Sequence, residues 1–314
     1  MALEVGVSLP VFLDRHGSAQ PDIAGAARHA EDIGLDAAWS GDHLSTGAPF
    51  VDSTVALTAA ATATERIRLG YGVMLIALRH PAWTAKQVGS LQLLSGNRLR
   101  LGVGVGGQWP DEWAAAGVPT AARGRRTDAI VALLPGLLAG EPTRLATEPG
   151  EPEVTLAPGV PMPPLWVGGM SEVALRRAVR IGAEGWLGSM VPPSVIPGVA
   201  GRLAGLAEEA EAEAAVPALG MIVFSELVPR GGTGRDAAVR YLTRSYGMPE
   251  DYARQVSVSG PPELLAERIT GYAEAGVSHF VIATVGAGVR DQYDLVAEAR
   301  AALDGVRPTG PGRV

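Results

Sequence analysis

The amino-acid sequence predicts an α/β protein built as a (β/α)8 TIM barrel with insertions. Short apolar runs rich in branched residues alternate with stretches of helical apolar spacing, at roughly 30-residue intervals. Parallel strands require this pattern because each return to the same edge needs a crossover helix. Such a barrel takes about 250 residues, and the chain has 314. We expect one barrel domain at 1–305, with excursions near 141–164 and 228–259 and a flexible tail at 306–314.

The first half of the chain contains four of the eight predicted strands. Gly34 ends the first helix, Asp52 caps the second, and Pro81 opens the third at its first turn. The expected strands are 4–9, 35–38, 67–73 and 99–105, and the expected helices are 21–33, 52–64, 81–95, 111–115 and 123–138.

The second half resumes the repeat after a Pro-rich segment at 141–164. The expected strands are 165–167, 185–187, 220–227 and 279–284, and the expected helices are 171–181, 195–214, 262–275 and 292–303. Residues 228–259 show no clear strand, so we expect a partly helical insertion there. The tail is rich in Pro and Gly.

The composition excludes several kinds of site. The chain has no cysteine, which removes disulfides, thiolate nucleophiles and Cys-ligated zinc. A net charge of -7 and scattered arginines argue against a nucleic-acid-binding surface. The sequence has neither a long apolar run nor a basic segment followed by an apolar one at its start. We therefore expect no membrane span, no signal peptide and a cytoplasmic location.

Active sites of such barrels lie where strands end and βα loops begin. The second strand delivers Asp42 and His43, and the fourth delivers Gly106, Gly107, Gln108 and Trp109. The fifth ends in Gly168, Gly169, Met170 and Ser171 at the start of a helix. Backbone N–H groups there would favour a phosphate, although a tight turn explains the Gly pair equally well.

The residues at the strand ends argue against two kinds of active site that are common in such barrels. Lys86, the sole lysine, falls within a helix, which argues against a Schiff-base aldolase. The strand ends lack three carboxylates, and the five histidines have no metal-site spacing, so we expect no catalytic metal. A phosphate seat, one imidazole and apolar walls instead suit a bound organic cofactor and a small-molecule substrate.

Ordered segments along nearly the whole chain match one known family. They include Trp39-Ser40-Gly41-Asp42-His43, Arg66-Ile67-Arg68-Leu69-Gly70, Arg79-His80-Pro81, Leu94-Ser95-Gly96-Asn97-Arg98, Leu101 to Gly106, Pro164 to Gly169 and Ser259-Gly260-Pro261-Pro262. With these segments the chain resembles the bacterial luciferase-like oxidoreductases, and especially the actinobacterial group assigned to coenzyme F420. The resemblance implies a (β/α)8 barrel, a reduced F420 or FMN cofactor, and a homodimer.

The resemblance also implies the positions of site residues. Gly72-Val73 would carry a non-prolyl cis peptide whose bulge backs the cofactor ring. Gly168, Gly169, Met170 and Ser171 would take the cofactor phosphate, with Gly106 and Gly107 also beside the cofactor. His43 would face the reactive edge of the ring.

His43 is the residue that best suits this chemistry, because reduced flavin reactions move protons and imidazole titrates near neutrality. Asp42 could orient His43 or cap the loop. Without the family pattern, an Asp-His pair after a strand is as often structural as catalytic. A supporting role in the loop is equally open for His80, and we expect His16, His29 and His279 to be structural or on the surface.

The chain also departs from the pattern of the resemblance. Members that oxidise a sugar phosphate with F420 have Glu where this chain has Gly107, and Trp where it has Gly47. Glu112 is the nearest replacement, but a helix-start charge or a structural contact to Arg123 or Arg125 is the favoured interpretation. The alkanesulfonate type of monooxygenase carries a rim cysteine that is missing here.

Further side chains could contact the substrate. Arg290, in the loop after the eighth strand, could meet an anion, although a solvated loop arginine is commoner. Candidate walls of the pocket are Trp109, Trp113, Met170, Met190 and Phe224, although such residues near strand ends more often belong to the core.

Four functions remain open at this point. F420-dependent hydride transfer is slightly favoured over an FMN-dependent monooxygenase supplied by a partner flavin reductase. The other two are a barrel that binds flavin without catalysis and a cofactor-free isomerase. The sequence contains no substrate signature.

Overall fold

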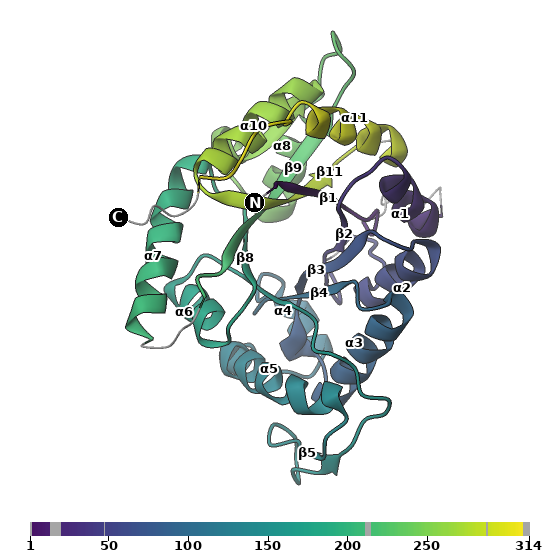
Figure 1. The fold of residues 1–314 in the computed structure, drawn as a ribbon, viewed down its shortest axis with the longest axis vertical. Coiled ribbons are helices and arrows are strands. Elements are labelled where there is room, and N and C mark those ends of the chain that lie inside the picture. The colour runs from purple at the N-terminus through teal and green to yellow at the C-terminus, as the bar shows by residue number, and fades with distance from the viewer. Residues whose placement is uncertain (1, 13–19, 47, 211–214, 287, 310–314) are drawn as a thin grey trace.

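The barrel is formed by eight parallel strands and is closed, which confirms the predicted fold (Figure 1). The computed structural model describes residues 2–12, 20–46, 48–210, 215–286 and 288–309. In barrel order the strands are β1 (Glu4–Ser8), β2 (Ala37–Ser40), β3 (Arg68–Met74), β4 (Leu99–Val103), β7 (Leu165–Gly168), β8 (Gly185–Ser189), β9 (Ala218–Leu227) and β11 (Val277–Thr284). Parallel pairing of β11 with β1, with Glu4 opposite His279, closes the ring.

Helices surround the strands on the outside (Figure 1). They are α1 (Ile23–Asp32), α2 (Ser53–Ala63), α3 (Pro81–Ser95), α5 (Arg123–Ala139), α6 (Glu172–Arg180), α7 (Ile196–Glu209), α10 (Pro262–Glu274) and α11 (Val289–Ala301). The predicted end signals are confirmed: Asp52 accepts a hydrogen bond from the Val55 amide at 3.0 Å, and Pro81 is the first residue of α3. α3 ends at Gly96, whose φ of 63° is left-handed.

The first excursion lies outside the barrel sheet. Its strands β5 (Thr143–Arg144) and β6 (Glu153–Val154) form an antiparallel pair at the lower end of Figure 1. Shorter elements also follow the barrel strands: the helix α4 (Pro110–Ala115) and the 3-10 turns Ile76–Leu78, Thr120–Ala122 and Pro193–Val195.

The second excursion differs from the prediction. It contains the expected helices, α8 (Ala237–Tyr246) and α9 (Glu250–Val256), but the expectation that it holds no strand is wrong. β10 (Ser257–Gly260) pairs with Phe224 to Leu227, the part of β9 beyond its pairing with β8. The segment Ser-Val-Ser-Gly has no apolar run that would predict a strand. It is a strand because it pairs with the free edge of β9, and not because of its local propensity.

Large side chains fill the barrel and determine where glycine is required. Trp39 and Trp166 pack edge to face inside it, with ring centroids 6.1 Å apart. A Cβ on Gly70 would lie 2.1 Å from the Trp39 ring, and one on Gly102 would lie 2.0 Å from the Tyr71 carbonyl oxygen. Glycine is therefore required at these positions of β3 and β4, because a larger residue would clash with its neighbours.

The chain beyond α11 continues along the barrel wall. Val306 packs against the core, and the Thr309 amide donates to the Ala273 carbonyl of α10 at 3.1 Å. Residues 306–309 of the expected flexible tail therefore contact α10, and 310–314 lie outside the described residues.

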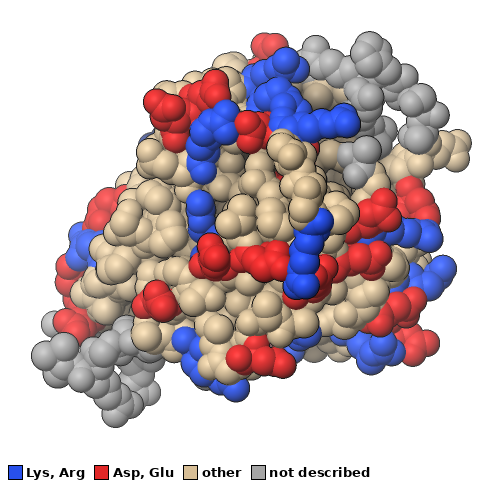
Figure 2. Space-filling model, turned by 90° about the horizontal axis from the view of Figure 1, so that it is seen from above, with Lys and Arg blue, Asp and Glu red and all other residues tan. Residues whose placement is uncertain are grey.

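Charge on the surface is mixed in sign. On the face shown in Figure 2, Lys and Arg side chains lie beside Asp and Glu side chains. Ion pairs between partly exposed side chains, such as Arg202 with Glu172, also bring opposite charges together on the surface. Among the described residues, no helix is both long and apolar enough to cross a bilayer.

Candidate active site

Asp42 follows β2, and its carboxylate is enclosed by donors. It accepts hydrogen bonds from the Ser53 hydroxyl at 2.6 Å, the Leu75 amide at 2.8 Å and both terminal nitrogens of Arg79 at 2.7 Å. Ser53 begins α2, and the other two flank the 3-10 turn after β3. Asp42 therefore joins three segments of the rim.

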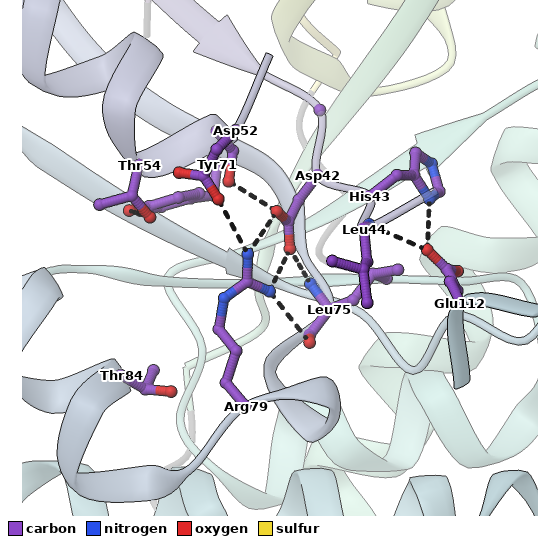
Figure 3. Close-up of polar contacts among 12 residues, drawn as sticks. Asp42, His43, Leu44, Asp52, Thr54, Tyr71, Leu75, Arg79, Thr84 and Glu112 are labelled. Carbon is purple, nitrogen blue, oxygen red and sulfur yellow. Dashed lines mark hydrogen bonds and ion pairs between the residues drawn. The ribbon is translucent and has the colours of Figure 1, made fainter. Parts of the chain in front are cut away.

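The side chains of Asp42 and His43 interact with different neighbours. Figure 3 shows their side chains pointing to opposite sides of the chain, Asp42 toward Arg79 and His43 toward Glu112. Of the two roles that the sequence left open for Asp42, the geometry supports capping the loop. Its bonding capacity is used by Arg79, Ser53 and Leu75, so it does not orient the imidazole.

His43 is held by Glu112 of α4. Its Nδ1 lies 3.4 Å from Glu112 Oε2, which also accepts a hydrogen bond from the Leu44 amide at 3.2 Å. Of the two structural interpretations of Glu112, the helix-start charge is confirmed, since Glu112 lies in the first turn of α4. The expected contact with Arg123 or Arg125 is wrong: among the described residues no ion pair joins them, and the fully buried carboxylate faces the imidazole. Helix α4 places Glu112 next to the loop after β2. The sequence did not predict its pairing with His43, because the two residues lie 69 positions apart.

Burial lowers the pKa of His43 below its ordinary value of 6.5, while the charges of Glu112 and Asp42 act in the opposite direction. The side chain is only 17% exposed, because the Trp109 ring covers it at a centroid distance of 4.4 Å. The lowered pKa favours the uncharged form of the imidazole at neutral pH. A neutral ring that donates from Nδ1 to Glu112 has its lone pair on Nε2, where it can accept a proton.

The peptide bond between Gly72 and Val73 is cis, as the resemblance implied. The Val73 side chain lies over two glycines of neighbouring strands: a Cβ on Gly104 would come within 2.4 Å of it, and one on Gly168 within 3.0 Å. The packing of Val73 therefore explains the glycine at position 104, next to β4, and contributes at Gly168 of β7.

Gly106 and Gly107 follow β4 with φ values of 54° and 108°, so both occupy the left-handed half of backbone space. A Cβ on Gly106 would lie 3.3 Å from the Trp113 ring, and one on Gly107 would lie 2.9 Å from Arg123 Nε. A side chain at position 107 would therefore require the Arg123 side chain to move.

The expected phosphate seat lies at the N-terminus of α6. Ser171 is the N-cap, and its hydroxyl accepts a hydrogen bond from the Ala174 amide at 3.3 Å. Gly169, with a φ of 116°, and Met170, 38% exposed, precede it at the surface. Glu172 places a carboxylate in the first turn, but Arg176 and Arg202 pair with it.

The candidate wall residues divide into two groups. Trp113 is 1% exposed and belongs to the core, whereas Trp109 contacts His43. Phe224 and Met190 pack in an aromatic cluster with α8. Sequence reasoning missed four further aromatic side chains that pack with these residues: Phe12, Phe50, Tyr241 and Tyr246, which come from distant segments.

The other candidates lie away from this site. Arg290 belongs to α11, and not to the preceding loop, and it donates to Asp22 at 2.6 Å. His80 lies 3.7 Å from Glu148, and Lys86 in α3 donates to the Ala157 carbonyl at 2.7 Å. Gly47 and His16 are outside the described residues.

A family model for luciferase-like monooxygenases matches residues 3–246. The chain belongs to this family. An uncharacterised protein of Mycobacterium tuberculosis (strain H37Rv) is 37% identical over 166 residues, 52% of this chain and 57% of the relative. An F420-dependent glucose-6-phosphate dehydrogenase of Beutenbergia cavernae is 34% identical over 170 residues, 49% of this chain and 48% of the relative. The matches thus span about half the length of these curated relatives.

Solved structures of luciferase-like enzymes share the fold. An F420-dependent secondary alcohol dehydrogenase in complex with an F420-acetone adduct has a TM-score of 0.78 at 18% identity, covering 96% of this chain and 99% of its own. The oxygenating constituent of 3,6-diketocamphane monooxygenase from Pseudomonas putida, in complex with FMN, has a TM-score of 0.74 at 15% identity, covering 99% and 100%.

In this luciferase-like chain, the residues around β4 fit a polar organic cofactor. Three buried polar atoms without a hydrogen-bond partner lie on neighbouring residues: Glu112 Oε1, Trp113 Nε1 and Arg123 Nε. Gly106 and Gly107 border Trp113 and Arg123, so a ligand over these glycines would come close to the two unpaired N–H groups. Unpaired buried donors are costly, and a cofactor carrying carbonyl or phosphate oxygens would satisfy them.

Proposed function

We propose that the chain is an oxidoreductase that uses reduced F420 to exchange hydride with a small organic substrate at the carboxyl ends of β2, β3 and β4. The observation that carries the proposal is the buried imidazole of His43, whose Nδ1 lies 3.4 Å from the Glu112 carboxylate, on the strand next to the one that bears the cis peptide Gly72-Val73. The F420-dependent relatives support the choice of cofactor.

His43 carries the proton in this proposal, and Glu112 fixes the ring through Nδ1 so that Nε2 faces the substrate. When a substrate carbonyl receives hydride from the reduced cofactor, Nε2 of the protonated ring would give its proton to the carbonyl oxygen. In the reverse direction the neutral ring would accept the proton of the substrate hydroxyl, and the hydride would pass to the oxidised cofactor. The covering Trp109 ring keeps water from the imidazole. Asp42 contributes indirectly, because its bonds to Arg79 and Leu75 hold the turn after β3 in place.

The cofactor would supply the hydride. Gly72 and Val73 would back its ring, Gly106 and Gly107 would leave space beside it, and the amides of Gly169, Met170 and Ser171 would take its phosphate. These amides lie at the exposed N-terminus of α6, where the helix dipole favours an anion.

A flavin-dependent monooxygenase is the second candidate, because the FMN-bound diketocamphane enzyme shares the whole fold. Reduced FMN would activate oxygen, and a partner flavin reductase would have to provide the reduced FMN. For either cofactor we propose a homodimer, which light scattering of the purified protein would test.

Binding titrations test the cofactor. Purified protein is titrated with F420 and with FMN, each in oxidised and reduced form. Tight binding of F420 alone supports hydride transfer, and preference for reduced FMN supports the monooxygenase. Binding of neither would refute both.

A His43→Ala variant tests the base. We expect turnover to fall at least about 100-fold, with cofactor affinity nearly unchanged, because the imidazole moves a proton and does not hold the cofactor. His80→Ala, a loop histidine paired with Glu148, is the control and should keep turnover. Unchanged turnover in His43→Ala would remove His43 from the mechanism.

A further inference from the structure

Six aromatic rings form a closed circuit that includes the proposed base. The neighbouring pairs and their centroid distances are His43 and Phe50 at 5.9 Å, Phe50 and Phe12 at 4.6 Å, Phe12 and Tyr241 at 6.0 Å, Tyr241 and Tyr246 at 6.0 Å, Tyr246 and Trp109 at 6.0 Å, and Trp109 and His43 at 4.4 Å. All six contacts are edge to face, and Phe224 stacks on Tyr241 from β9. In a chain with only 5% aromatic residues, this concentration is unusual.

The circuit joins parts of the rim that are far apart in sequence. Phe12 follows β1, Phe50 precedes α2, and Trp109 precedes α4, whereas Tyr241 and Tyr246 belong to α8 of the second excursion. The excursion therefore reaches across the barrel to the loop that carries His43.

Specific hydrogen bonds hold both sides of the circuit. Phe12 and Phe50 form an isolated antiparallel bridge, and the Val51 amide donates to the Val11 carbonyl at 2.9 Å. At the start of α8, the Glu226 carboxylate accepts hydrogen bonds from the amides of Arg235 at 2.9 Å and Ala237 at 2.8 Å. Tyr241 and Tyr246 thus belong to a helix whose start is hydrogen-bonded to Glu226 of β9.

The circuit is largely apolar, and its polar groups are the His43 imidazole and the phenols of Tyr241 and Tyr246. Its side chains include neither lysine nor arginine, the cations that hold a phosphate or carboxylate. Burial raises the pKa values of both phenols, and Tyr241 donates to Tyr246, which leaves the O–H of Tyr246 to donate to an oxygen. Phe12 is 41% exposed, so the circuit is open to solvent on that side.

We propose that these rings form the substrate site, and that the substrate is a planar, uncharged, largely apolar molecule bearing a hydroxyl or carbonyl oxygen. This inference rests on the proposed function, since it places that oxygen between His43 and the phenol of Tyr246, which both pack against Trp109. Ring faces and edges attract a flat π system, and each aromatic contact contributes up to about tenfold in affinity.

A phosphorylated sugar does not fit these rings. The phosphate group would lose its hydration without finding a lysine or arginine among the six side chains, and the sugar hydroxyls would contact ring carbons instead of hydrogen-bond partners. This differs from the sugar-phosphate substrate in the name of the F420-dependent relative. The chain therefore shares the family's fold and has a site of different chemistry.

The test uses 2-naphthol as the probe, with 2-naphthoate as a charged molecule of the same shape. Affinities are measured by calorimetry with the protein saturated by the cofactor that it binds, and also without cofactor. We expect 2-naphthol to bind at least about tenfold more tightly than 2-naphthoate and glucose 6-phosphate.

Two variants and a control locate the binding. Trp109→Leu and Tyr246→Leu should each weaken 2-naphthol about tenfold while leaving cofactor affinity within threefold. Trp83→Leu, which removes an exposed tryptophan of α3, should change neither. Circular dichroism confirms that each variant is folded, and Trp109→Phe, which keeps a ring, should retain most of the affinity.

The outcomes separate this inference from the proposed function. Cofactor binding without 2-naphthol binding, or equal affinity for 2-naphthoate, would overturn the substrate class and leave the function standing. Loss of cofactor affinity in both leucine variants would show that the rings cover the cofactor instead, and would also overturn it. If neither F420 nor FMN binds, the proposed function itself fails, and the inference fails with it.

Discussion

Replacing Asp42 tests whether it is a structural residue of the rim. Its carboxylate has no exposed surface and pairs with Arg79, whose side chain is 20% exposed. Removing one partner of a buried ion pair leaves the other charge unpaired and costs about 3–5 kcal/mol. Asp42→Ala should therefore lower the free energy of unfolding by about 4 kcal/mol, or the melting temperature by about 6 °C for a chain of this length.

The partner variant separates the ion pair from the other bonds of Asp42. Arg79→Met removes the charge that Asp42 faces, and the double variant removes both charges. We expect the double variant to be less destabilised than the sum of the single variants by about 2 kcal/mol, because neither charge is then left alone.

Urea unfolding followed by circular dichroism measures these values, and cofactor titration of each folded variant accompanies it. Asp42→Ala should keep cofactor affinity at temperatures where it is folded. A loss of stability below about 1 kcal/mol, combined with loss of turnover, would refute the structural role and return Asp42 to the chemistry.

Two further predictions concern stability. Burial and Arg100 lower the pKa of His279 from 6.5 to about 4, so the unfolded chain binds this proton more tightly than the folded one. The free energy of unfolding should therefore fall as the pH drops from 6.5 to about 4, by up to about 3 kcal/mol, and His279→Gln should flatten that slope in urea titrations at several pH values. Gly102→Ala, whose Cβ would meet the Tyr71 carbonyl oxygen at 2.0 Å, should destabilise the barrel by at least about 1–3 kcal/mol. Gly201→Ala in α7, with open space around it, should stabilise by about 0.5–1 kcal/mol, and thermal melts that rank the two alike would contradict the packing argument.

Local patterns made most of the fold predictable. Caps such as Asp52, the Pro at the start of α3 and the branched runs of the strands act over a few residues, so the sequence shows them directly. β10 could not be found this way, because Ser257 to Gly260 form a strand only where the end of β9 offers a free edge.

Local features of the candidate site were predictable where the family pattern names positions, and its contacts were not predictable where partners meet through space. His43 lies in a matched segment, and the resemblance also implied the cis peptide at Gly72-Val73. The pairing of Asp42 with Arg79 spans 37 residues, and that of His43 with Glu112 spans 69. No periodicity links such positions, so their roles required the fold. The aromatic circuit could not be predicted for the same reason, since its rings, such as Phe12 and Tyr241, come from segments far apart in sequence.

The most direct test of where the cofactor binds is hydrogen exchange of the protein with and without the reduced cofactor. The account predicts slower amide exchange in the peptides that span 39–46, 70–78, 104–113 and 167–174, the loops after β2, β3, β4 and β7. Peptides of the β5 and β6 hairpin serve as the internal control and should not change. Tight binding with protection confined to other parts of the chain would contradict the proposed site.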